Sequence, residues 1–297
     1  YEDSRTYGID FKIKGQDWVD WAVLRFMECL RVSKGLVAWV VEGKTKDFKW
    51  SATPALFMAD LHRAGVCLRK PPAYCRVGIP GSGGPDWLRN DYEWVICASH
   101  GKLPWSDNTV MGHDPKFPPG GNPSHHSKDG RINRPRLQRE GNVRRIRTYT
   151  PPKKANPGNL IRCHGGGGHM GSSLAHENEA PFPEKLVEFF IRSFCPPNGT
   201  VCDPFSGSGT TLAAAIKCGR KAIGFDIRES QITLTNRRIE ESYNSLTERI
   251  SDMPFRVKAT RQDEGRYQLA FGKGNQKLLG TAGQDAEKKW GVICDAT

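Results

Sequence analysis

A turn rich in glycine, set between two apolar runs, constrains this chain more than any other stretch. Its parts are, in order, a β-prone run at 200–203, a turn at 204–209, an alanine-rich helix-prone stretch at 210–217 and a second apolar run at 222–227. Pro204 lacks an N–H donor, and Gly207 and Gly209 permit positive φ, so the first strand cannot continue through the turn. The order predicts two parallel strands joined by a right-handed crossover helix, with Gly219 ending the helix.

Acids at the ends of both predicted strands give this turn the character of a nucleotide site. Glycines at the carboxyl end of a strand, beside a helix N-terminus, let a ligand approach the backbone. Asp203 ends the first strand and Asp226 ends the second. An acid about 20 residues after the turn can accept hydrogen bonds from both ribose hydroxyls. The alternative is an ordinary strand–turn–helix without a ligand.

The residues after the turn disfavour two common nucleotide motifs. A phosphate-binding loop needs lysine after its last glycine, whereas Gly209 is followed by Thr210 and Thr211, so ATP or GTP is not expected. A dinucleotide fingerprint needs a third glycine where this chain has Leu212. A cofactor without a pyrophosphate, such as S-adenosylmethionine, suits the turn.

The stretch from Asp203 to Thr211, Asp-Pro-Phe-Ser-Gly-Ser-Gly-Thr-Thr, resembles the cofactor motif of the DNA methyltransferases that modify N4 of cytosine or N6 of adenine. The resemblance extends over residues 1–245. It implies an α/β fold with a doubly wound, mostly parallel sheet, S-adenosylmethionine as cofactor and double-stranded DNA as substrate. It also implies a ribose contact from Asp226. The residues that it places around the rest of the cofactor are Asp203, Pro204, Phe205, Ser206, Gly207, Ser208, Gly209 and Thr210.

In one permuted branch of that family the catalytic motif is N-terminal and the cofactor motif is C-terminal, and the late position of the turn matches this order. The family's catalytic motif is Asp/Ser/Asn-Pro-Pro-Tyr. We interpret Tyr1 as the last residue of that motif, with a catalytic role in stacking on a flipped base; an arbitrary N-terminal tyrosine is the alternative. The first residue of the motif hints at the target base, so cytosine N4 and adenine N6 both remain open.

Residues 1–100 are interpreted as the catalytic half of the methyltransferase domain. Apolar periodicity predicts helices at 17–30 and 54–64. The run at 36–41 predicts a strand buried on both faces, as in a parallel sheet. Two further strand candidates, 66–77 and 92–98, are expected to form an antiparallel pair at the sheet edge.

Residues 101–170 show no periodic pattern and carry much of the chain's net charge of +12. They hold five lysines and eight arginines against four acidic residues. Arginine can pair with guanine and neutralise phosphate, so we interpret this segment as a target-recognition insertion; a solvated linker is the alternative. The predicted DNA-binding residues are Arg131, Arg134, Arg136, Arg139, Arg144, Arg145 and Arg147.

Residues 171–248 are interpreted as the cofactor-binding half. By the resemblance, the segment at 176–183 before helix 184–194 also contacts the cofactor, through His176 or Glu177, and His176 is assigned to it; capping of that helix is the alternative. A long amphipathic helix is expected at 228–246, with residues 236–238 facing solvent. Residues 249–297 show no clear period and are expected to form a disordered or loosely docked tail.

The nine cysteines follow no paired spacing, which indicates reduced thiols in a cytoplasm rather than disulfides. Neither a signal peptide nor an apolar run long enough to cross a membrane is visible. Cys163, His164 and His169 match no standard zinc finger, so no metal is expected. These features indicate a cytoplasmic protein, and the resemblance to the DNA methyltransferases implies that it is prokaryotic or phage-encoded.

Three other functions remain open on the sequence alone. The chain could methylate RNA or a small molecule, although its basic insertion disfavours this. It could be a catalytically incomplete DNA-binding fragment of a methyltransferase. It could be a nucleotide-binding oxidoreductase, which the missing third glycine disfavours. No Pro-Cys nucleophile is visible, which disfavours methylation at carbon 5 of cytosine.

The resemblance also allows a cognate restriction endonuclease as a partner.

Overall fold

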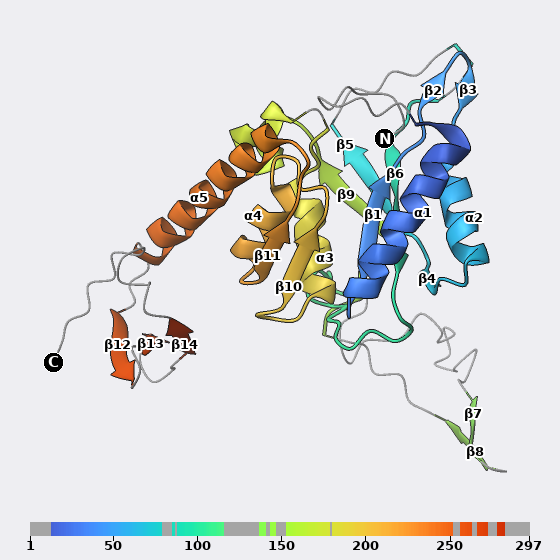
Figure 1. The fold of residues 1–297 in the computed structure, drawn as a ribbon. Helices are drawn as coiled ribbons and strands as arrows, with labels where there is room; N and C mark the ends of the chain where they lie inside the picture. Colours follow the sequence, from blue (N-terminus) through green and yellow to red (C-terminus); the bar gives the residue numbers. More distant parts are fainter. Residues whose placement is uncertain are drawn as a thin grey trace. The chain divides into compact units, whose positions relative to one another are not determined.

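The computed structural model of the chain describes residues 13–78, 85–86, 88–115, 137–140, 143–146, 153–178, 180–251, 256–262, 266–272 and 278–282. The chain divides into two compact units, Tyr1–Ile239 and Glu240–Thr297, which are described separately. Figure 1 shows the course of the chain. The helices of the described residues are α1 (Gly15–Val32), α2 (Thr53–Arg63), η1 (Gly167–Met170), η2 (Ser173–Glu177), α3 (Glu184–Phe194), α4 (Thr210–Lys217) and α5 (Glu229–Ser251).

The first unit contains a mixed five-stranded sheet in the order β1-β6-β5-β9, with β4 also paired to β6. Strand β5 runs parallel to β9, and the other pairs in this sheet are antiparallel. A second, parallel pair joins β10 to β11. The strands of these two sheets are β1 (Val37–Val41), β4 (Leu68–Arg69), β5 (Ala73–Val77), β6 (Tyr92–Ala98), β9 (Leu160–His164), β10 (Thr200–Asp203) and β11 (Lys221–Gly224).

The directions of these strands correct two expectations. The apolar run at 36–41 was predicted to lie in a parallel sheet, but β1 pairs antiparallel with β6. Strands β5 and β6 form the predicted antiparallel pair, yet they lie inside the sheet order rather than at its edge. Burial on both faces makes a strand uniformly apolar whatever its direction, so composition alone did not reveal the pairing.

Helices cover both faces of the five-stranded sheet, and successive residues of β6 face opposite layers. Ile96 and Ala98 belong to the core with α1 and α2, whereas Val95 and Cys97 belong to the core that includes Leu186 of α3. All four β6 residues are buried. A third core packs α3 against α4, and it lies beside β10 and β11. The α/β class predicted from the sequence is therefore confirmed (Figure 1). The five-stranded sheet is mixed, however, and not mostly parallel as predicted.

The range 101–170 contains structure that the sequence did not predict. Strand β9 pairs with β5 along its whole length, so the last part of this range belongs to the main sheet. Strands β7 (Leu137–Glu140) and β8 (Val143–Ile146) form an antiparallel hairpin.

A further antiparallel pair lies outside this range: β2 (Thr45–Lys46) pairs with β3 (Lys49–Trp50) before α2.

The second unit contains three strands among its described residues, whereas a disordered or loosely docked tail was expected. Strands β12 (Arg256–Gln262), β13 (Arg266–Gly272) and β14 (Leu278–Ala282) pair in that order as an antiparallel sheet. Their pairing depends on contacts between strands, which a search for apolar periodicity within one segment does not detect. No helix in the described part of the chain is both long and apolar enough to cross a membrane.

Candidate cofactor site

The glycine turn lies at the carboxyl ends of β10 and β11, as predicted. Asp203 pairs with Gly224 at the ends of the two parallel strands. Beyond that point Phe225 N–H donates to the Asp203 carbonyl (2.9 Å), and Ser206 N–H donates to the Phe225 carbonyl (2.8 Å). The chain then enters α4 at Gly209. Residues 206–210 are all buried, so this turn is a fixed part of the fold.

Both glycines of the turn have the left-handed backbone that the sequence predicted, with φ of +52° at Gly207 and +76° at Gly209. A Cβ atom on Gly207 would fall 2.9 Å from Asn178 Nδ2. A Cβ atom on Gly209 would fall 3.0 Å from Thr235 Cγ2 and 3.1 Å from Thr235 Cα. The backbone conformation at both positions therefore favours glycine, and a Cβ atom at either would displace a neighbouring residue.

Asp226 holds the turn from the second strand. Its Oδ2 accepts a hydrogen bond from Gly207 N–H (3.0 Å), and its Oδ1 accepts one from Arg228 N–H (3.0 Å). Arg228 Nε also lies 3.5 Å from Oδ1. Each carboxylate oxygen has two lone pairs, so these bonds leave acceptor capacity for hydroxyl groups of a ligand. Asp226 thus lies against the turn, where the sequence pattern placed it.

Asp203 carries a carboxylate at the base of the turn. Its Oδ1 accepts a hydrogen bond from Phe205 N–H (2.9 Å), and its side chain also bonds to that of Thr211. Burial raises the pKa of this carboxyl above its usual value, and the two hydrogen bonds only partly offset that effect. No lysine or arginine of the described chain forms an ion pair with it. A cationic ligand would supply the missing charge.

The raised pKa of Asp203 makes the stability of the ligand-free protein dependent on pH. A carboxyl whose pKa is higher in the folded state binds more protons there, so the free energy of unfolding falls as pH rises through that pKa. Asp203→Asn removes this ionisation. We expect the variant to melt above wild type at neutral pH without cofactor and to match it at low pH, while its cofactor affinity falls. Calorimetric scans across pH measure this; a variant that melts below wild type at neutral pH contradicts it.

Helix α5 supports the turn through a buried polar face that the sequence analysis missed. Residues 236–238 were expected to face solvent, but Arg238 is completely buried. Gln231, Thr235 and Arg238 recur at helical spacing, and all three are buried. Thr235 Oγ1 donates to the Gly207 carbonyl (2.8 Å). The helical spacing of these three polar residues is a signal in the sequence, but a buried helix face is usually recognised from its apolar residues alone.

The segment before α3 contributes Asn178 to the site rather than a helix cap. The residue before α3 is Pro183, and no side chain caps the helix, so the capping alternative for His176 and Glu177 is wrong. His176 lies in η2 and is exposed. Glu177 pairs with Arg237 of α5 at 3.2 Å. The side chain of Asn178 lies directly against Gly207, because it occupies the space that a Cβ atom there would need.

Two buried polar atoms beside the turn test whether a polar cofactor fits there. Ser206 Oγ and Asn178 Oδ1 have no hydrogen-bond partner among the described residues. Buried polar atoms normally have partners, so these two atoms are suited to a polar ligand. Together with the Asp203 carboxylate, they fit a compact, cationic and polar cofactor such as S-adenosylmethionine.

Phe205 lies on the open side of the turn and is 49% exposed. Its ring centroid is 5.8 Å from that of Trp21 in α1 and 5.3 Å from that of Trp39 in β1. The guanidinium of Arg25 lies 5.0 Å from the Trp21 ring centroid. Trp21 lies in the helix predicted at 17–30 and Trp39 in the strand predicted at 36–41, and neither was predicted to contact the turn.

Most of the predicted catalytic and DNA-contacting residues lie outside the described residues. Tyr1 is among them, as are four of the seven arginines: Arg131, Arg134, Arg136 and Arg147. The other three lie in the hairpin, Arg139 on β7 and Arg144 and Arg145 on β8. Arg139 is the register partner of Arg144. The backbone therefore brings these three basic residues together within one hairpin.

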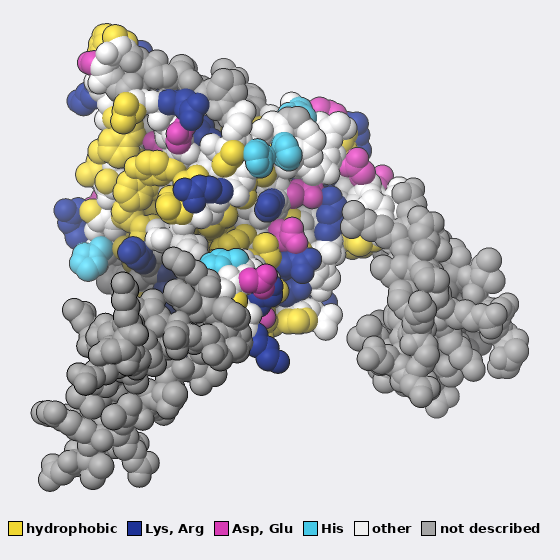
Figure 2. Space-filling view, turned by 180° about the vertical axis from the view of Figure 1, so that it is seen from behind, with side chains coloured by type: hydrophobic (Ala, Val, Ile, Leu, Met, Phe, Trp, Pro, Cys, Tyr) yellow, Lys and Arg dark blue, Asp and Glu magenta, His cyan; other side chains and the backbone are white. Residues whose placement is uncertain are grey.

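The ends of the segment that carries these arginines are fixed to each other. His113 and Ala155 form an antiparallel bridge, and Lys154 Nζ lies 2.7 Å from Asp114 Oδ1. Asp107 N–H donates to the Ser193 carbonyl of α3 (2.8 Å). On the face of the molecule shown in Figure 2, the basic side chains are interspersed with acidic ones instead of forming a continuous basic stripe.

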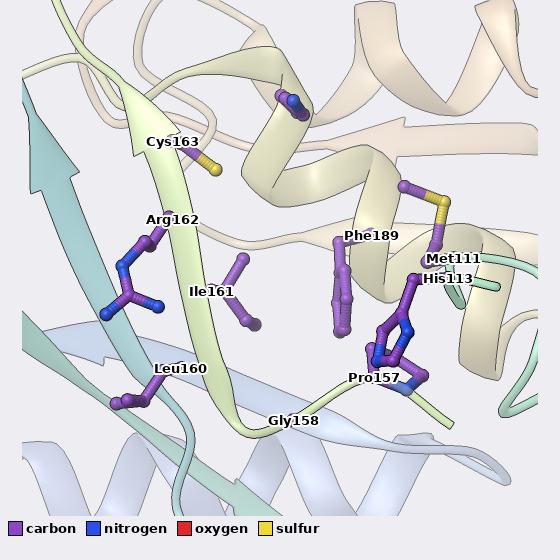
Figure 3. A pocket seen from close by; sticks show the side chains of 10 residues that line it. Met111, His113, Pro157, Gly158, Leu160, Ile161, Arg162, Cys163 and Phe189 are labelled. Carbon is purple, nitrogen blue, oxygen red and sulfur yellow. The ribbon is translucent and has the colours of Figure 1, made fainter. Parts of the chain in front are cut away.

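A pocket of about 260 Å³ lies between β9, α3 and two loops, apart from the glycine turn (Figure 3). Ile161 points toward Phe189, and Arg162 points to the other side of the strand. Leu160 and Met111 add further apolar surface to its lining. None of the predicted cofactor residues lines this pocket. Its apolar lining therefore says nothing about the chemistry of the candidate cofactor site at the glycine turn.

No group of three or more potential metal ligands occurs among the described residues. His164 and His169 stack with ring centroids 5.0 Å apart, and Cys163 is buried. Eight cysteines in the described part of the chain are free thiols. Burial raises the pKa of Cys163 and of Cys195, which lowers their thiolate fraction and makes them poor nucleophiles.

The structure is similar to that of the PvuII DNA methyltransferase (cytosine-N4-specific), with a TM-score of 0.52 and 18% sequence identity, over 82% of this chain and 81% of that one. At this identity the likeness concerns the fold alone. It agrees with the α/β architecture and its mixed sheet.

The sequence model of the DNA methylase family for N6 and N4 methylation matches residues 1–237. The chain therefore belongs to the N6/N4 DNA methylase family, whose reaction moves a methyl group from S-adenosylmethionine to an exocyclic amine of a base in DNA. The family predicted from the turn is confirmed, and so is its cofactor.

Several curated methyltransferases are similar to this chain in sequence. The orphan methyltransferase M.BamHII of Bacillus amyloliquefaciens is 31% identical over 273 residues, which cover 86% of this chain and 91% of that protein. The type II methyltransferase M.ScaI of Streptomyces caespitosus is 40% identical over 67 residues. That match spans only 23% of this chain and 22% of M.ScaI.

Proposed function

We propose that this chain methylates the exocyclic amine of a cytosine (N4) or an adenine (N6) at specific sites in double-stranded DNA. The observation that carries the proposal is the rigid turn at residues 206–209, held between Asp203 and Asp226 at the carboxyl ends of two parallel strands. Membership of the N6/N4 DNA methylase family supplies the reaction class. The similarity to M.BamHII extends over most of both chains and supports the same assignment.

The residues around the turn would hold the cofactor by complementary chemistry. The left-handed backbone at Gly207 and Gly209 lets the turn pack closely against Asn178 and Thr235, and this packing holds the backbone that would bind the cofactor. The Asp203 carboxylate would favour the cationic groups of the cofactor, and Asp226 would accept hydrogen bonds from its ribose. Ser206 and Asn178 each offer a buried polar atom that has no partner among the described residues. We retain His176 as a contact because it lies two residues before Asn178.

Bound S-adenosylmethionine supplies an electrophilic methyl group on a cationic sulfonium. The contribution of the protein is to hold the turn fixed and to align the target amine, because orientation lowers the barrier of such a transfer. A base in a duplex must leave the stack to reach this edge of the sheet. The raised pKa values of Cys163 and Cys195 support direct transfer without a cysteine nucleophile.

The parts of the chain are assigned as follows within this proposal. Residues 1–100 form the catalytic half, with Tyr1 stacking on the flipped base, and residues 171–248 form the cofactor half of one doubly wound domain in permuted order. Residues 101–170 recognise DNA, except that β9 within this range belongs to the main sheet. No role is assigned to residues 249–297. A cytoplasmic location and a cognate restriction endonuclease fit the free thiols and the names of the type II relatives.

The test of the proposed function is transfer of labelled methyl from S-adenosylmethionine to unmethylated double-stranded DNA. The DNA is then digested and its nucleosides are separated. Label in N4-methylcytosine or N6-methyladenine supports the proposal and identifies the base. Label in 5-methylcytosine, or in RNA alone, contradicts it. Cofactor binding without any labelled nucleic acid leaves a cofactor-binding protein whose acceptor is not DNA.

A second measurement tests the recognition region. Lysine and arginine contacts to phosphate release counterions, so log affinity falls linearly with log salt, by about 0.9 for each phosphate contact on duplex DNA. Changing Arg139, Arg144 and Arg145 to glutamine should weaken DNA binding and flatten this slope. Arg31→Gln and Arg63→Gln, on helices α1 and α2, are controls with exposed side chains. DNA affinity of the wild type that does not change with salt would contradict the assignment.

A further inference from the structure

A buried arginine outside the predicted cofactor motif connects the glycine turn to the rest of the site. The side chain of Arg238 is completely buried. Its Nη1 lies 2.8 Å from Thr210 Oγ1 and 3.2 Å from Ser208 Oγ. Its Nη2 donates to the Met170 carbonyl (2.8 Å) and to Glu184 Oε1 (3.0 Å). One guanidinium therefore links the turn to η1 and to α3.

The charge of Arg238 is balanced inside this network. Glu184 lies at the start of α3 with its side chain 14% exposed, and its second oxygen accepts a hydrogen bond from Lys217 Nζ of α4 (2.8 Å). The backbone of Gly171 lies against the same carboxylate, because a Cβ atom there would fall 2.1 Å from Glu184 Cδ. A buried charge pair of this kind is costly to disturb on one side only.

The hydrogen-bond directions give Arg238 a specific role. A guanidinium is planar and presents its donors in a fixed fork. Met170 and Glu184 hold Nη2 in place, and the planar guanidinium then determines where Nη1 lies. The hydrogen bonds of Nη1 in turn hold the side chains of Ser208 and Thr210. These two residues flank Gly209, so the orientation of the fork sets the conformation of the turn at residues 208–210, whereas Asp226 holds it at Gly207. Neither Arg238 nor Glu184 is among the predicted cofactor contacts.

We infer that Arg238 is a positioning residue for the cofactor: it holds the turn at residues 208–210 in the conformation that binds S-adenosylmethionine. The inference rests on the proposed function. Arg238 acts through the turn, and it does not touch the reacting atoms. A lysine at this position would keep the positive charge but could not span both groups of acceptors as a fork.

The test compares Arg238→Lys with Arg220→Lys. Arg220 is the matched control, because its guanidinium also binds backbone carbonyls, those of Cys195 and Cys218, away from the turn. We expect Arg238→Lys to remain folded and to bind S-adenosylmethionine about ten- to hundredfold more weakly, since charged hydrogen bonds are lost. Its KM for the cofactor should rise by a similar factor, with kcat at saturating cofactor close to that of wild type. Arg220→Lys should keep wild-type affinity.

Hydrogen exchange gives a readout that does not depend on the cofactor. The backbone amides of residues 208–211 should exchange faster in Arg238→Lys than in wild type. Faster exchange together with weaker cofactor binding supports the positioning role. A variant with a lower melting temperature but unchanged cofactor affinity and KM would overturn it and leave a purely structural arginine. Failure of the wild type to bind S-adenosylmethionine in the same titration would overturn the proposed function as well.

Discussion

Replacing Gly209 with alanine is expected to weaken cofactor binding by about tenfold or more and to destabilise the protein. Gly209 has φ of +76°, where a residue with a Cβ atom is strained by about 1–2 kcal/mol. The new Cβ atom would also lie 3.1 Å from the Cα of Thr235, a backbone atom that cannot rotate away. Relief of that contact requires a small shift of the turn or of helix α5, which holds the turn through Thr235, and each 1.4 kcal/mol lost to binding is about tenfold in affinity. Titration with S-adenosylmethionine and thermal melting measure the two effects.

Gly219→Ala is the control for this variant. Gly219 also has a positive φ, +70°, but a Cβ atom there would have no heavy atom within 4 Å outside its chain neighbours. The control should therefore lose a similar amount of backbone stability and keep its cofactor affinity. If both variants bind the cofactor as wild type does, the turn does not form the cofactor site.

Asp226→Ala is expected to lower cofactor affinity by about a hundredfold and the free energy of unfolding by about 2 kcal/mol. The carboxylate accepts hydrogen bonds from the backbone N–H groups of Gly207 and Arg228. Its side chain is only 10% exposed, so alanine would leave buried donors without partners. It would also remove the acceptor for the ribose. Calorimetric titration and chemical unfolding give the two quantities.

The matched control for Asp226 is Asp107→Ala. The Asp107 carboxylate accepts hydrogen bonds from the backbone N–H groups of Thr109 (3.0 Å) and Val110 (3.1 Å), as a similar local turn outside the cofactor site. Loss of the Asp107 carboxylate should lower the free energy of unfolding without changing cofactor affinity. Equal losses of affinity in both variants would show that the effect at Asp226 is a general consequence of destabilisation.

The part of the site that could be predicted is the part encoded locally. Helices α3 and α4 span the residues predicted for them, and Asp203 and Asp226 lie against the turn as expected. Turn chemistry, helix propensity and strand length all operate within about ten residues there, so one stretch of sequence specifies the result.

The missed parts depend on contacts between distant residues. The antiparallel direction of β1 is set by its pairing with β6, more than fifty residues later. Arg238 was expected in solvent because a charged residue is rarely buried without a partner, and its partners lie on α3, α4 and η1. Polar residues at helical spacing on α5 carried the signal, but the acceptors that make their burial favourable could not be located from the sequence.

The bridge between His113 and Ala155 has a consequence for how such a protein can acquire new specificity. This bridge and the ion pair between Asp114 and Lys154 hold the two ends of the intervening segment at one point, so its length can change without moving the residues on either side. Each doubling of its length would cost only about 0.6 kcal/mol of loop-closure entropy. Under the proposed assignment of residues 101–170 to DNA recognition, the recognised sequence and the methyl-transfer site would then change independently of each other.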